Sequence, residues 1–216
     1  MGAKPGFPLF QLALVVALVC WASVSNPADR QLPPFGKDTV LVWEIQNQDF
    51  QSQFVARIAE FLPDRYLEWE DQTTQGTIFM PNRAVTNARG FVSARLFEAG
   101  VDTRGKDVTT LWLSENIYRD LKQRKRAKVV LDGIDSWMTL DGVDQLTVEV
   151  NKAPLNLPVI KVKDDRGSER WFIDNDENSL MVKHEIRKFC QTLVSITTDQ
   201  PNTLRWIKGK KLTNPH

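Results

Sequence analysis

The chain has 216 residues, of which 42% are hydrophobic and 25% are charged, and these are the proportions of an ordinary globular protein. Its 28 lysines and arginines nearly balance 27 aspartates and glutamates, which excludes a nucleic-acid surface built on bulk positive potential. The two cysteines exclude a disulfide-dense scaffold.

Residues 1–25 have the layout of a secretory signal peptide. Lys4 precedes an uninterrupted apolar stretch from Leu12 to Ala22, and small residues follow. The stretch is shorter than the roughly 20 residues of a spanning helix. We therefore expect an exported protein, periplasmic or extracellular, with cleavage near Asn26. If the segment is not cut, it would tether the protein to a membrane as a marginal N-terminal anchor.

The remaining chain is expected to hold a single folded domain. Residues 26–37 contain three prolines and a glycine without periodicity, which is typical of a linker. The domain is predicted over residues 38–198, and residues 199–216 form a basic C-terminal tail.

Alternating apolar and polar residues predict strands from the start of the domain. Leu41, Trp43 and Ile45 alternate in this way, and Leu67 with Trp69 repeats the pattern. Residues 50–62 fit both periods, because apolar side chains recur at every fourth position and also at every second. We favour a strand there and keep a helix as the alternative.

The clearest helix is expected over Glu115–Arg124. Ser114 is a good N-cap, and Ile117 with Leu121 would form the buried stripe. A basic run stands at its carboxyl end, where the helix dipole favours cations: Lys122, Arg124, Lys125, Arg126 and Lys128. We interpret the run as a solvated helix end, with a patch for phosphate or anionic lipid as the alternative.

The second half of the chain continues as strands. Leu146, Val148 and Val150 alternate with polar residues, so these three are expected to face the interior. Further strands are expected at residues 127–131, 159–162, 171–173, 180–186 and 190–197. Turns are predicted at Asp132-Gly133, Asp141-Gly142 and Arg166-Gly167. The fold is predicted to be mainly β (antiparallel meander, sandwich or partly open barrel) with one short helix; an α+β fold is the alternative.

His184 is the histidine that alternates with strand residues, since the other, His216, ends the chain. It shares a face with Val182 and Ile186, which favours a partly buried structural histidine. A hydrolase would need a serine or Cys190 beside it and an orienting carboxylate, and no nucleophile motif points to one. The acidic residues do not form a recognisable catalytic pattern either. We therefore assign no catalytic, cofactor-binding or metal-binding residue and no cofactor.

The spacing of a calcium-binding loop occurs once. Counting from Asp174 as the first ligand position puts Asp176 at position 3, Asn178 at 5 and Glu185 at 12. Ser179 replaces the glycine of the sharp turn, and the flanks are strand-like rather than helical. A polar turn between strands is favoured, and a calcium-stabilised adhesion module remains an alternative.

Six tryptophans follow the leader, and three of them alternate with aliphatic residues. These three, Trp43, Trp69 and Trp171, are expected in the core. Trp206 stands in the basic tail beside lysines and an arginine. A cavity lined by tryptophans inside a barrel is the alternative to a filled interior.

The segments TTLWLSENIYRDLK, LTVEVNKAPLNLPVIKV and ERWFIDNDENSLMVKHEIRKF followed by LVSIT resemble uncharacterised exported bacterial β-rich proteins. The resemblance covers roughly residues 110–197. It implies a location in the bacterial cell envelope and supplies no catalytic residue.

These patterns together predict a non-catalytic protein of the cell envelope. We expect it to bind an apolar small molecule between sheet and helix, or to dock an envelope protein, and not to bind nucleic acid. An exposed apolar patch would favour docking, whereas a cavity of roughly 300 Å³ or more would favour a ligand. A hydrolase using His184 or acidic residues is the competing class.

Overall fold

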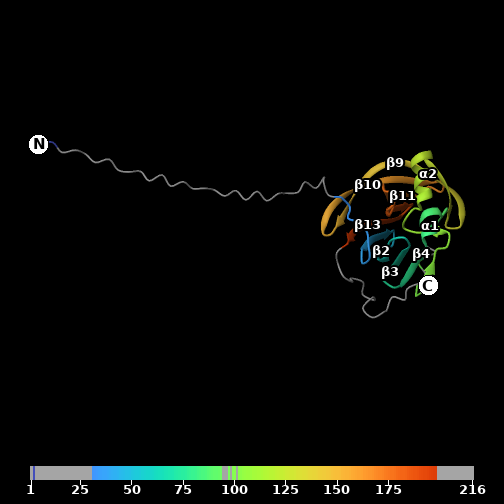
Figure 1. Cartoon of the computed structure of the whole chain (residues 1–216), viewed down its shortest axis with the longest axis horizontal. Helices are drawn as coiled ribbons and strands as arrows, with labels where there is room; N and C mark the ends of the chain where they lie inside the picture. Colours follow the sequence, from blue (N-terminus) through green and yellow to red (C-terminus); the bar gives the residue numbers. More distant parts are fainter. Residues whose placement is uncertain (1, 3–30, 94–96, 98, 101, 199–216) are drawn as a thin grey trace.

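The computed structural model describes residue 2 and residues 31–93, 97, 99–100 and 102–198. The expected leader and the basic tail therefore lie outside the described residues (Figure 1). The described part is mainly β, as predicted, with thirteen strands in one sheet and two helices. None of its helices combines the length and the apolar character that crossing a membrane requires.

In chain order the elements are β1 (Val40–Asn47), β2 (Phe50–Glu60), β3 (Arg65–Glu70), β4 (Gln75–Met80), α1 (Asn82–Asn87), β5 (Gly90–Phe91), β6 (Asp102–Arg104), β7 (Val108–Thr109), α2 (Glu115–Arg124), β8 (Arg126–Leu131), β9 (Ile134–Val150), β10 (Ala153–Asp164), β11 (Glu169–Ile173), β12 (Met181–Ile186) and β13 (Phe189–Thr197). The segment with two possible periods is thus a strand, β2, which confirms the favoured interpretation.

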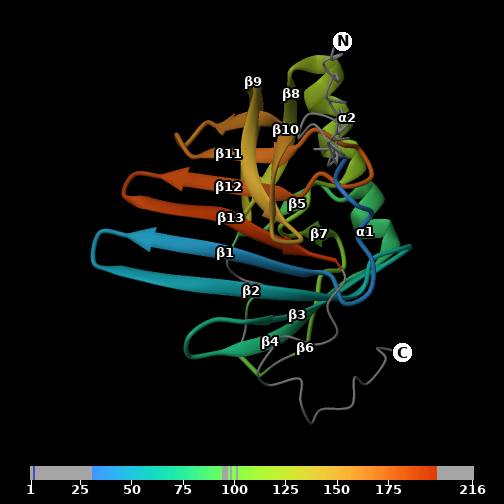
Figure 2. The ribbon, with the colours of Figure 1, turned by 90° about the vertical axis from the view of Figure 1, so that its left-hand side faces the viewer.

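The strands form one long curved sheet, and the strands in its middle close into a ring. Its strand order is β6-β4-β3-β2-β1-β13-β12-β11-β10-β9-β8-β5-β7, and β13 also pairs with β9. This extra pairing is parallel and joins Ser195 to Glu149 and Ile196 to Val150. Strands β9 to β13 therefore form a closed ring of five, and β1 to β4 continue the sheet beyond it (Figure 2).

Strand β9 runs through a position where a turn was predicted, which corrects the expectation for Asp141-Gly142. In the ladder with β10, Gly142 pairs with Lys161 and Leu140 pairs with Val162. Asp141 is therefore an extra residue without an opposite partner, which is a β-bulge. A bulge and a turn share the same residue preferences, so the Asp-Gly pair marked a bend within one long strand.

Both helices lie together on one side of the curved sheet (Figure 2). Helix α2 has the predicted bounds, and Oγ of Ser114 accepts the backbone N–H of Ile117, as expected of an N-cap. Lys125 ends the helix in the left-handed conformation, with φ 63°. Helix α1 is an additional short element that the alternation pattern did not predict.

Large aromatic side chains fill the interior. Trp43, Trp69 and Trp171 are buried, which confirms their prediction as core residues. Trp43 also donates its indole N–H to the carbonyl oxygen of Met181 at 3.1 Å and so links β1 to β12. Trp137 differs from these three because it is 41% exposed.

Candidate functional site

His184 makes the serine contact that a hydrolase would need. Its Nε2 lies 2.7 Å from Oγ of Ser168. Only 7% of His184 and 1% of Ser168 is exposed, so a substrate carbonyl has no route to the hydroxyl. Moreover, within the residues that the structure describes, no carboxylate hydrogen-bonds the imidazole ring to orient it. The pair therefore lacks both access and the third member of a triad.

A buried polar cluster accounts for this histidine. Burial, and secondly the positive charge of Arg170, lowers the pKa of His184 to about 3, so the ring stays neutral. Arg170 forms a buried ion pair with Asp164 at 2.8 Å. Asp164 also accepts the backbone N–H of Ser168 at 3.0 Å. Each charge in the cluster has an opposite partner, as a stable interior requires.

The acidic turn after β11 does not gather its carboxylates around one point. Lys122 and Tyr118 both donate to Asp174, each at 2.6 Å, and these bonds keep the pKa of Asp174 below its usual value although burial raises it. Glu185 instead lies 2.7 Å from Lys183. The first and last positions of the calcium-like spacing are thus held by different lysines. Nowhere in the described ranges do three His, Cys, Asp or Glu side chains cluster as a metal site would.

The two glutamates of β3 have different environments. Glu68 is buried and accepts hydrogen bonds from Nε and Nη2 of Arg57, at 2.9 and 2.6 Å. Arg57 also pairs with Asp38. Burial raises the pKa of Glu68 despite the Arg57 hydrogen bonds. Glu70 lies half-buried at the end of the strand, so the two carboxylates do not flank an open cleft.

A surface groove of about 500 Å³ lies between the end of α2 and the hairpin of β8 and β9. Its walls come from α2, from the link between α1 and β5, and from both strands of the hairpin. The lining residues are Arg89, Asp120, Arg124, Arg126, Lys128, Val129, Val130, Asp135 and Trp137.

The alternation of β8 builds the hairpin wall. Arg126, Lys128 and Val130 point outward, and the residues between them are buried. In the antiparallel ladder Lys128 lies directly opposite Trp137, and Val130 lies opposite Asp135. Side chains opposite each other in such a ladder are neighbours on one face. Basic and apolar side chains are therefore interleaved on a single exposed surface.

Positive charge exceeds negative charge in the groove. Four lining residues are cationic and two are acidic, so the lining carries a net charge of two positive units. Asp120 accepts from Arg89 and lies 3.5 Å from Arg124. Lys128 lies 3.3 Å from Asp135, and both side chains are well exposed. An ion pair that is exposed on both sides, such as Lys128 with Asp135, is weak and leaves the lysine able to bind an incoming anion.

Arg126 has no acidic partner among the described residues, and it stacks on the aromatic side chain of the groove. Its guanidinium carbon lies 4.7 Å from the ring centre of Trp137. Such a cation–π contact holds the guanidinium near the ring while its N–H groups stay free to donate. The groove therefore offers an anion-binding donor and an apolar surface side by side.

The sequence identified part of this site. The basic run was recognised at the end of α2, and a patch for phosphate or anionic lipid was its less favoured interpretation. Arg89 and Trp137 were not connected with the run, because they come from other elements, and Asp120 was not connected with it although it lies in α2 itself. The alternation of Arg126, Lys128 and Val130 opposite the next strand was the signal that could have revealed the shared face.

Comparison with known proteins gave no match: no family model, no curated protein and no solved structure is significantly similar to the chain.

Proposed function

We propose that this protein is a non-catalytic binding protein whose groove between α2 and the β8–β9 hairpin receives a ligand with both a negative charge and an apolar part. The observation that carries the proposal is the stacking of Arg126 on the exposed Trp137 within a lining of net positive charge. The proposal refines the expected apolar ligand between sheet and helix by adding the charge. The expected export to the cell envelope is retained as part of the proposal.

Binding explains the exposed groove better than catalysis does. The one serine–histidine pair described is buried and engaged in the core. The groove, in contrast, has the size of a small-molecule site and combines apolar surface with a few polar groups. Nothing in its lining provides a general base next to a nucleophile.

Two related dyes test the proposal. The dye 8-anilinonaphthalene-1-sulfonate is anionic, and N-phenyl-1-naphthylamine has the same aromatic frame without the sulfonate. In fluorescence titrations of the full chain we expect the anionic dye to bind at least about tenfold more tightly. The variant Arg126→Ala/Lys128→Ala should weaken its binding about tenfold, because two charge-assisted contacts of about 0.5–1 kcal/mol each are lost.

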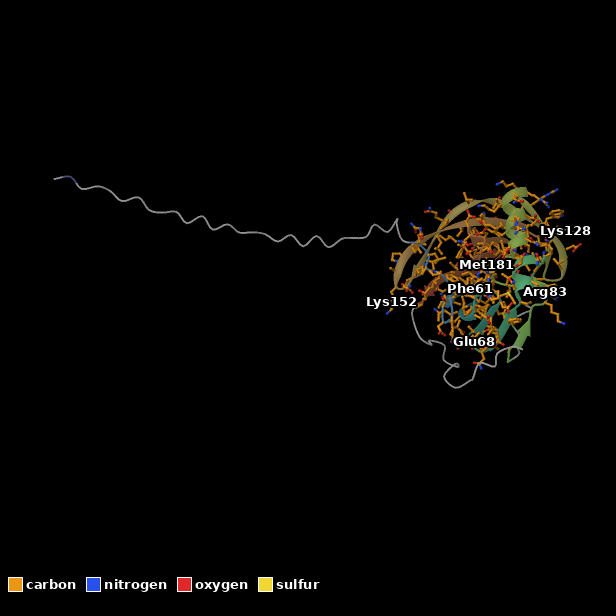
Figure 3. The ribbon with its side chains drawn as sticks, in the orientation of Figure 1. Phe61, Glu68, Arg83, Lys128, Lys152 and Met181 are labelled. Atoms are coloured by element: carbon orange, nitrogen blue, oxygen red, sulfur yellow. The ribbon has the colours of Figure 1, made fainter. Side chains whose placement is uncertain are left out.

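The matched control is Lys152→Gln, which removes one exposed lysine at the far side of the fold from Lys128 (Figure 3). It should leave the affinity for the anionic dye unchanged. Equal affinities for the two dyes, or an unaltered affinity in the double variant, would refute the proposal.

A further inference from the structure

The four cations of the groove come from its two walls. Arg89 and Arg124 belong to the wall formed by α2 and the link between α1 and β5, whereas Arg126 and Lys128 belong to β8. Helix α2 and strand β8 lie side by side at one end of the fold (Figure 2). An anionic group inside the groove therefore meets cations from both walls.

Two of these cations are not neutralised within the groove. The lining contains two acidic residues, and each of them already has a partner. Asp120 accepts from Arg89, and Asp135 pairs with Lys128 at 3.3 Å. The net charge of two positive units therefore resides on the other two cations of the lining, which are both arginines.

These two arginines, Arg124 and Arg126, keep most of their donors available. The side chain of Arg124 is 73% exposed and lies 3.5 Å from Asp120. Arg126 is held by its stacking on Trp137, with 4.7 Å between the guanidinium carbon and the ring centre. A guanidinium has five N–H donors in a planar arrangement, so these contacts leave several donors for a ligand.

We propose that the anionic part of the ligand is a phosphate monoester, bound between Arg124 and Arg126, and that its apolar part lies along Trp137 and Val130. The inference rests on the proposed function, because it names the chemical class of the ligand of the same groove. A phosphate monoester has about two negative charges at neutral pH and three acceptor oxygens.

A phosphate monoester matches the groove in charge and in hydrogen bonding. A carboxylate or a sulfonate has a single negative charge and would leave one of the two arginines without a counter-charge. The planar guanidinium of arginine donates paired hydrogen bonds to phosphate oxygens. Arginines stand on both walls of the groove, so the three oxygens of one phosphate can accept from both walls at once.

Strand register places the apolar surface beside these arginines. Arg126, Lys128 and Val130 point outward from β8, and Trp137 lies opposite Lys128 in the ladder with β9. Val130 is 37% exposed and Trp137 is 41% exposed. Because these side chains share one face of the hairpin, a ring or short acyl chain attached to the phosphate can cover Trp137 and Val130.

Isothermal titration calorimetry of the full chain with two matched ligands tests the inference. The two ligands, 1-naphthyl phosphate and 1-naphthyl sulfate, have the same ring and the same number of terminal oxygens. At pH 7.5 the phosphate has about two negative charges, whereas the sulfate has one. We expect the phosphate to bind about tenfold more tightly, because both arginines attract its additional charge.

Arg124→Gln removes one of the two charges that are not neutralised, from an exposed position where folding does not depend on it. The preference for the phosphate over the sulfate should fall from about tenfold to about threefold. Arg119→Gln is the matched control, since Arg119 is an exposed arginine of the same helix that lines a different groove. It should leave the preference unchanged.

The outcomes are distinct. If the anionic dye binds as proposed but the phosphate binds no more tightly than the sulfate, the phosphate monoester is refuted as the ligand class and the proposed function stands. A preference that is unaltered in Arg124→Gln, or that falls equally in Arg119→Gln, refutes it as well. If the dye and both naphthyl ligands fail to bind, the proposed function falls with the inference.

Discussion

The buried His184 should make the protein lose stability between neutral and mildly acidic pH. Its pKa is about 3 in the folded protein and about 6.5 in the unfolded chain. At a pH between these two values, His184 therefore binds a proton in the unfolded chain but not in the folded protein. A histidine whose pKa is lowered by folding does not reduce the unfolding free energy at pH values above its unfolded pKa. The reduction grows as the pH falls from 6.5 toward 3.

The magnitude follows from these two values. At pH 7.5 the unfolded histidine is nearly neutral, and the penalty is close to zero. At pH 5.0 the unfolded histidine is protonated and the folded one is not, since 5.0 is well above 3. The difference amounts to about 2 kcal/mol of unfolding free energy, at about 1.36 kcal/mol per pH unit below 6.5.

Urea unfolding of the full chain and of His184→Gln at pH 7.5 and 5.0 measures this effect. Glutamine cannot titrate, and its amide can still reach the hydroxyl of Ser168. The variant should be less stable at pH 7.5, because it fits the site less well. Its unfolding free energy should nevertheless fall by about 2 kcal/mol less than that of the parent on acidification.

His216→Gln is the control, because it removes the chain's other histidine. It should leave the pH dependence as in the parent. An equal loss of stability in the parent and in His184→Gln would refute the conclusion that His184 is held neutral in the folded protein.

Two further substitutions test the buried polar contacts by urea unfolding at neutral pH. Arg57→Met should lower the unfolding free energy by about 3–5 kcal/mol, since it leaves the buried carboxylate of Glu68 without its partner. A loss below about 1 kcal/mol would show that the carboxylate protonates without penalty. Ser114→Ala should cost about 1–2 kcal/mol, because Oγ of Ser114 both accepts from the first turn of α2 and donates to the carbonyl of Ala88, and an unchanged stability would contradict the capping role.

The sequence predicted those helices and strands whose cap residues and apolar periodicity lie within a single segment of the chain. Helix α2 combines a serine cap, a buried stripe of Ile117 and Leu121, and a basic last turn, so several local preferences agree. Val148 and Val150 are buried and the residues between and before them are exposed, as alternation required. In both cases burial against the rest of the fold follows the period of the segment itself.

Helix α1 had no comparable signal. It spans Asn82–Asn87, and its N-cap, Pro81, makes no side-chain capping bond. The backbone N–H of Asn82 is accepted instead by Asp64, from the link between β2 and β3, at 2.6 Å. Such a short segment is helical because of its contacts with α2 and β7 rather than its own propensity. Sequence periodicity cannot detect a helix of this kind.

The groove could not be predicted from the sequence, for a different reason. Arg89 and Asp120 belong to segments that meet only in the folded chain, and Trp137 faces them because of the register between β8 and β9. The sequence shows the basic run but not which elements stand opposite it. Whether a tryptophan lies in the core or on the surface depended on strand register, which alternation alone does not give.

The position of β13 constrains how the molecule can be assembled. The last strand of the described fold lies between β1 and β12 and also completes the ring with β9. Strand β1 pairs with β2 on one side, but its partner on the other side, β13, lies almost 150 residues further along the chain, and contacts so distant in sequence slow folding. A nascent chain lacking its final segment would leave the sheet in two unjoined halves, so the native structure can form only once synthesis has passed β13.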